Sequence, residues 1–114
     1  MTPQEMKQLA ELLQQMPGMT GRDADALARD VIAARGFGDD FGHSLGHGLG
    51  LEVHEAPRLA PTADAALPVH AVVTVEPGIY LPGWGGVRLE DDVHLGSEGA
   101  ELLSDARTDL LELP

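Results

Sequence analysis

The feature that most constrains the fold is a change of hydrophobic period at Gly36. Before this residue, apolar side chains recur every three to four positions, which is typical of amphipathic helices. After it, the pattern changes to glycine-rich loops and to runs in which apolar and polar residues alternate, which is typical of half-buried strands. Because the helical part precedes the strand part, the sequence predicts an α+β fold with two N-terminal helices followed by an antiparallel sheet.

Both expected helices carry start signals. The first opens with Thr2 as a cap and Pro3 at the first helical position, a combination that favours a helix N-terminus. The second begins at Thr20 and closes at Gly36, the usual place for a left-handed residue after a helix. Together the helices occupy about residues 3–36, and their Met and Leu stripes are typical of core rather than of a cofactor site.

The strands that would carry a site are expected between about residues 41 and 103, within a single domain spanning residues 1–114. Alternation and β-branched runs mark them, whereas a stretch rich in Pro, Ala and Asp indicates a connecting loop. The expected strands cover residues 49–54, 72–76, 87–95 and 100–103, and the expected loop covers 56–70.

Composition limits the partners. Nineteen acidic against seven basic residues give a formal charge of −12, which disfavours nucleic acid and anionic membrane surfaces. No apolar run approaches the ~18 residues of a membrane span, and the first residues lack signal-peptide features, so a cytoplasmic location is expected. Cysteine is absent, which leaves His, Asp and Glu as the plausible metal ligands. The acidity serves either solubility or cation binding.

Three stretches place histidines and single carboxylates among glycines and β-branched residues. They are GHSLGHGLGLEVHEAP (42–57), VVTVEPGIY (72–80) and VRLEDD (87–92). A carboxylate buried without a partner is costly, and a metal ion is the partner that would also explain the histidines.

The histidines allow two interpretations. His43 and His47 have the four-residue spacing of zinc-binding helices. The glycines around them instead favour a loop and strand whose backbone passes close to something bound. A single histidine is better explained by a structural role, but three of them in this Gly-rich setting, with His54, favour a site.

The carboxylates are also ambiguous on spacing alone. Glu76 follows a strand-like run and precedes Pro77, so it would sit at a strand end, where ligands are commonly presented. Glu90 shares an expected strand face with Arg88, and this alternation fits the solvated side of an amphipathic strand.

Taken together, these motifs resemble the pita-bread metallopeptidases, the family of methionine aminopeptidase, aminopeptidase P and prolidase. The match covers about residues 17–103, and its motifs occur in the family's order. His43, four residues before His47, and Arg88, two before Glu90, are typical of the Xaa-Pro branch.

The resemblance implies roles for these residues. His47 would be a terminal metal ligand, Glu90 would bridge two ions, and Glu76 would be a ligand beside the attacking water and the candidate general base. These ligands suit Mn²⁺, with Zn²⁺ or Co²⁺ as alternatives.

The remaining motif residues would act on the substrate, a peptide with proline at its second position. His54 would hydrogen-bond the scissile carbonyl or its tetrahedral intermediate, and His43 would line the substrate pocket. Arg88 would orient a nearby carboxylate.

One departure from the family is large. A complete member has a preceding half-domain that supplies two aspartate ligands, and no acid upstream of Phe41 follows a β-rich run. The chain is therefore expected to be the C-terminal half of an Xaa-Pro peptidase, truncated, holding one ion or none, and inactive or weakly active alone. The alternative is a non-catalytic peptide- or metal-binding half-domain that self-assembles as a homodimer or pairs with a complementing N-terminal half.

Overall fold

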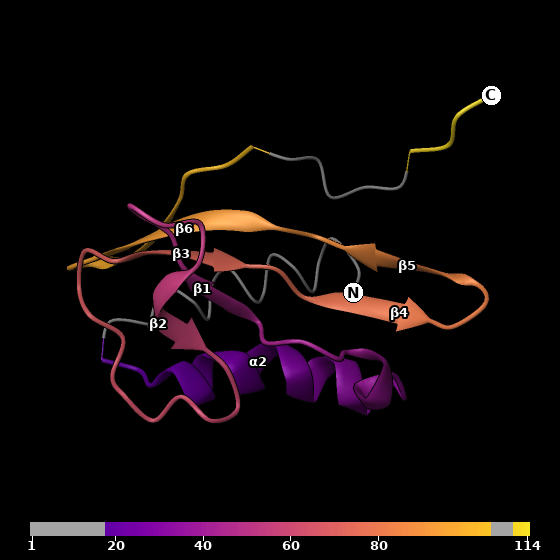
Figure 1. Ribbon diagram of the computed structural model, residues 1–114, viewed down its shortest axis with the longest axis horizontal. Helices are drawn as coiled ribbons and strands as arrows, with labels where there is room; N and C mark the ends of the chain where they lie inside the picture. Colours follow the sequence, from indigo (N-terminus) through magenta and orange to yellow (C-terminus); the bar gives the residue numbers. More distant parts are fainter. Residues whose placement is uncertain (1–17, 106–110) are drawn as a thin grey trace.

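Helix α2 (Gly21–Ala34) lies along one face of an antiparallel sheet, and a separate hairpin extends beyond the sheet (Figure 1). The computed structural model describes residues 18–105 and 111–114. This architecture confirms the α+β fold with an antiparallel sheet. The first expected helix lies outside the described residues, which contain α2 and a short 3₁₀ turn, η1 (Gly38–Asp40). Within them, no helix has the length and apolarity needed to cross a bilayer.

The ends of α2 follow the local signals in the sequence. The Thr20 hydroxyl accepts the backbone N–H of Asp23 at 3.1 Å, which satisfies one of the free donors at the helix N-terminus. Gly36 takes a positive φ of 87° just beyond the helix, a conformation that favours glycine.

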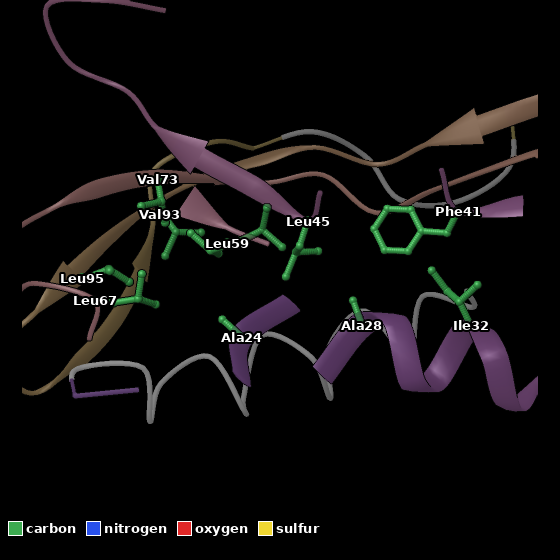
Figure 2. Close-up of a cluster of buried hydrophobic side chains, with 11 residues drawn as sticks. Ala24, Ala28, Ile32, Phe41, Leu45, Leu59, Leu67, Val73, Val93 and Leu95 are labelled. Atoms are coloured by element: carbon green, nitrogen blue, oxygen red, sulfur yellow. The ribbon is translucent and has the colours of Figure 1, made fainter. Parts of the chain in front are cut away.

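The core lies between α2 and the sheet. One stripe of α2 supplies side chains at four-residue spacing, and the sheet supplies the opposing layer (Figure 2). The buried residues labelled there are Ala24, Ala28, Ile32, Phe41, Leu45, Leu59, Leu67, Val73, Val93 and Leu95.

The main sheet has five strands in the order β2-β1-β3-β6-β7, and every pairing is antiparallel. Strands β4 and β5 form the separate hairpin, inserted between β3 and β6 along the chain. The bounds are β1 Gly46–Gly48, β2 Glu55–Leu59, β3 Val72–Val75, β4 Gly78–Leu81, β5 Gly85–Arg88, β6 Asp91–Gly96 and β7 Gly99–Leu102.

The strand expected over residues 49–54 is wrong. The loop expected over residues 56–70 is wrong in its first four residues, which belong to β2, and residues 60–70 form the connection from β2 to β3. Residues 49–54 form the connection between β1 and β2. Leu51 is fully exposed in this connection, and Val53 is largely exposed. Alternation therefore indicated a strand where the chain reverses direction. Strand β2 overlaps the start of the expected loop, and Pro57 is tolerated in it because β2 is an outer strand of the described sheet.

The single strand expected over residues 87–95 is two strands. The chain leaves the main sheet after β3, forms the β4–β5 hairpin, and rejoins the sheet as β6, so the strand is interrupted at Leu89 and Glu90. The other expectations at this end are confirmed, since β3 and β7 fall where β-branched and apolar runs predicted strands.

Candidate active site

His47 lies in β1, and Glu76 directly follows the neighbouring strand β3, so the two residues meet at the end of the sheet nearest the hairpin. The His47 Nε2 and Glu76 Oε2 atoms are 3.3 Å apart. Both side chains are largely buried, with 20% and 15% of their surfaces exposed. An imidazole and a carboxylate held this close, with partial access to solvent, form a pair that can share a proton or a cation.

The His47 ring is oriented by the backbone. Its Nδ1 donates to the carbonyl of Gly48 at 2.9 Å, so in the neutral ring Nε2 keeps its lone pair and faces Glu76. This is the arrangement in which metal-binding histidines are commonly held. The backbone N–H of His47 donates to Thr74 Oγ1 at 3.1 Å, which ties β1 to the strand that leads to Glu76.

Gly46 allows this close approach of strands. A Cβ at this position would lie 1.8 Å from the carbonyl oxygen of Thr74, a separation that no side chain can occupy. Gly46 is thus required for packing β1 against β3.

Glu90 lies opposite Glu76. Val75 pairs with Asp91 in the main sheet, and Gly78 pairs with Arg88 in the hairpin. Continuing either ladder places the two glutamates across from each other. Partial burial, and then the negative charge of Glu76, raise the pKa of the Glu90 carboxyl, and the positive charge of Arg88 opposes this shift.

The two other motif histidines flank this pair. The His54 ring centroid lies 4.4 Å from that of His47. His43 donates from Nδ1 to the carbonyl of Ser44 at 2.8 Å, and its Nε2 accepts the Tyr80 hydroxyl at 2.7 Å. Tyr80 is a partner that sequence reasoning missed, although it belongs to the second motif.

A cleft of about 680 Å³ opens over these residues. It brings together His43, His47, His54, Glu76 and Arg88 from three sequence motifs, whereas Glu90 is absent from its lining and lies beside Arg88, with Arg88 Nε 3.8 Å from Glu90 Oε2. Sequence reasoning missed the lining residues Ser44, Glu55 and Arg58.

Arg58 is the cationic residue among those missed. It lies opposite His47 in the β1–β2 ladder, and its Nη2 is 3.4 Å from Ser44 Oγ. The only available signal was its charge, in a segment that the composition indicated to be a loop.

The donor chemistry fits a divalent cation in part. An imidazole nitrogen with a free lone pair and a carboxylate oxygen converge, and a second carboxylate lies opposite the first. Across residues 18–105 and 111–114, no group of three His, Asp or Glu side chains is close enough to hold an ion as it stands. The residues thus fit part of a ligand set that further donors would complete.

Comparisons with known proteins agree with this geometry. The sequence model of metallopeptidase family M24 matches residues 5–97. The uncharacterized peptidase YqhT of Bacillus subtilis is 56% identical over 97 residues, and the Xaa-Pro dipeptidase of Pyrococcus furiosus is 48% identical over 95. These matches cover 85% and 83% of the chain but 28% and 27% of the relatives, so the chain spans little more than a quarter of their length.

Solved structures give the same result. The Xaa-Pro dipeptidase from Bacillus anthracis superposes with a TM-score of 0.83 at 48% identity, covering 96% of this chain and 33% of that one. The prolidase from Pyrococcus horikoshii OT3 gives a TM-score of 0.86 at 41% identity, covering 95% and 30%. The chain therefore belongs to metallopeptidase family M24, as the resemblance of its motifs predicted.

Proposed function

We propose that the chain provides one wall of a metal-dependent Xaa-Pro peptidase site. The observation that carries the proposal is the His47–Glu76 pair, 3.3 Å apart beneath a cleft lined by two further motif histidines. Family membership implies a divalent metal cofactor, and the names of the relatives suggest Xaa-Pro dipeptides as substrates. In this proposal residues 1–114 form one half of the catalytic domain.

The proposed ligands are His47, Glu76 and Glu90, with Mn²⁺ as the preferred ion. A bound divalent cation would supply the Lewis acidity that peptide hydrolysis needs. Its charge would also offset the repulsion between the two glutamates. Because a two-ion centre needs more donors than these, the isolated chain would bind one ion weakly and be inactive or weakly active.

The protein's own side chains would do the remaining work. The Glu76 carboxylate, held in place by its backbone and by His47, would accept the proton of the attacking water. His54, beside His47, would donate a hydrogen bond to the scissile carbonyl oxygen, and His43 would line the pocket for the substrate. Arg58 and Arg88 add positive charge to the cleft wall, which suits the free carboxylate of a dipeptide.

The test is a relaxation measurement, because it works even for an inactive chain. Mn²⁺ is paramagnetic, so it broadens the proton resonances of Ala-Pro strongly when ion and peptide share a protein site. We expect chain-dependent broadening of Ala-Pro that exceeds that of Ala-Ala and is lost in Glu76→Gln. The matched control, Glu98→Gln in the exposed turn between β6 and β7, should behave as wild type. Equal broadening with and without the chain would refute the proposal.

A second candidate function is self-assembly through the surface beside the cleft. Large apolar side chains are exposed on the 49–54 connection and on the β4–β5 hairpin, namely Leu51, Val53, Trp84 and Val87. Strands β2 and β7 are the outer strands of the described sheet. Exposed apolar residues and open edges favour association, here as a homodimer or with a complementing N-terminal half.

Sedimentation distinguishes these outcomes for the chain alone. A homodimer that brings the glutamates of two copies together should form with Mn²⁺ and dissociate without it. A monomer under both conditions would rule out self-assembly and leave the complementing half as the partner.

A further inference from the structure

Asp25 and Arg29 form an ion pair on helix α2, outside the three sequence motifs of the site. Arg29 donates from Nε to Asp25 Oδ2 at 2.7 Å and from Nη2 to Oδ1 at 3.1 Å. Only 2% of the Asp25 side chain and 27% of the Arg29 side chain are exposed. This two-point contact raises the pKa of Arg29 still further above its ordinary value.

The rest of the pair's hydrogen-bonding capacity goes to the segment that leads into β1. Arg29 Nη1 donates to the Phe41 carbonyl at 3.0 Å, and Nη2 donates to the His43 carbonyl at 2.8 Å. Asp25 Oδ1 accepts the Leu45 N–H at 3.0 Å. The guanidinium also lies over the Phe41 ring, 4.2 Å from its centroid. One ion pair thus fixes three alternate residues of a segment without regular structure.

Leu45 transmits this restraint to Glu76. Its N–H is bound by Asp25, and its carbonyl accepts the Glu76 N–H at 2.7 Å. This matters because β1 and β3 share a single register pair, Gly48 opposite Val73. The relative placement of His47 and Glu76 therefore depends on the few contacts that join β1 to β3 near this pair. The hydrogen bonds from Asp25 to Leu45 and from Leu45 to Glu76 are among these contacts.

We propose that Asp25 and Arg29 are a positioning pair that sets the distance between His47 and Glu76. The competing explanation is that the pair merely attaches α2 to the sheet. A buried ion pair is weak evidence for stability by itself. The hydrogen bonds that the pair makes outside the helix go to the backbone of residues 41, 43 and 45, which lead into β1. The consequence for metal binding rests on the proposed function, whereas the restraint on Glu76 does not.

The decisive variant is Arg29→Lys, which keeps the charge but cannot reach Asp25, Phe41 and His43 at once, because it lacks the planar fork of the guanidinium. The matched control is Arg22→Lys. Arg22 lies on the same helix as Arg29 and forms an exposed ion pair with Asp64 in the connection from β2 to β3. Both are compared with the wild-type chain at a temperature well below their unfolding midpoints.

Two readouts are measured, Co²⁺ affinity from its visible absorption and amide hydrogen exchange in the metal-free chain. In Arg29→Lys we expect the affinity to fall about tenfold or more, as for other groups that hold metal ligands in place. The Glu76 amide should lose protection about tenfold while the Val93 amide, in the β3–β6 ladder, does not. Arg22→Lys should change neither.

The outcomes separate the two claims. If Arg29→Lys lowers the unfolding midpoint but leaves Co²⁺ affinity and Glu76 exchange unchanged, the pair is only structural and the inference is wrong. If the wild-type chain binds no Co²⁺, the proposed metal site fails. The exchange of the Glu76 amide then decides the positioning role alone, with selective loss of protection supporting it and an unchanged rate refuting it.

Discussion

Glu76 and Glu90 lie opposite each other in one antiparallel register that runs from the main sheet into the β4–β5 hairpin. Both fall at the positions where the chain passes between the two sheets. Like charges directly across a ladder are destabilising, so a protein without a use for them would not benefit from this arrangement. A cation between or beside them would reverse the sign of the interaction, and this makes the pair informative about function.

The first prediction concerns Glu90 and pH. Because its pKa is raised in the folded protein, the stability that Glu90 contributes is fully present below its unfolded pKa, about 4.3. It is lost as pH rises through the folded value. Glu90→Gln cannot ionise, so we expect it to unfold at a higher urea concentration than wild type at pH 7. The difference should shrink toward zero near pH 4.

The control for this series is Glu98→Gln, in the exposed turn between β6 and β7. It should show no comparable dependence on pH. A Glu90→Gln protein that is less stable than wild type at pH 7 would show that Glu90 is a favourable charge rather than a strained one.

The second prediction concerns the approach of β1 to β3. A Cβ on residue 46 would collide with the Thr74 carbonyl, so Gly46→Ala must push the strands apart. We expect a loss of about 2–3 kcal/mol in the free energy of unfolding, measured in urea. Gly42→Ala adds the same methyl group where nothing lies within 4 Å, and its effect should stay within about 0.5 kcal/mol. Equal effects of the two substitutions would contradict the packing role of Gly46.

The fold could be predicted where its signals are local. The Thr20 cap and Gly36 bound α2, and the β-branched run of β3 marks that strand, because these features act through neighbouring residues. The strand prediction for residues 49–54 was wrong because Leu51 and Val53 alternate with polar residues as in a strand but lie exposed on the surface. Alternation of apolar and polar residues is a property of the side chains alone. It does not show whether the backbone forms hydrogen bonds with a neighbouring strand.

All of the predicted site residues except Glu90 line one cleft, but the contacts that hold them in place could not be predicted. The break between strands β5 and β6 at Leu89 and Glu90 left no trace in the sequence. The same antiparallel register continues across the break, so apolar and polar residues keep alternating through it. Asp25 and Arg29 were missed as a pair, although their i,i+4 spacing on a helix is a recognisable signal. Their role depends on Phe41, His43 and Leu45, and only the tertiary fold brings these residues to them.

The third prediction concerns the pH dependence of metal binding. An imidazole binds a cation only in its neutral form, and a carboxylate only when ionised. We therefore expect Mn²⁺ affinity to weaken as pH falls from 8 to 5, through the region near ~6.5 where histidine side chains ordinarily take up a proton. Calorimetric titrations at several pH values measure this. A binding constant that stays flat across the range would exclude histidine from the site.

The most direct test of the account is Mn²⁺ binding to the chain itself, followed by the electron paramagnetic resonance signal of the free ion. We predict one weak site per chain in the wild type, and at least a tenfold loss of affinity in the double variant His47→Ala, Glu76→Gln. His70→Ala, which removes an exposed histidine remote from the cleft, should bind as wild type. Binding that is unchanged in the double variant would contradict the assignment of His47 and Glu76 as the metal ligands.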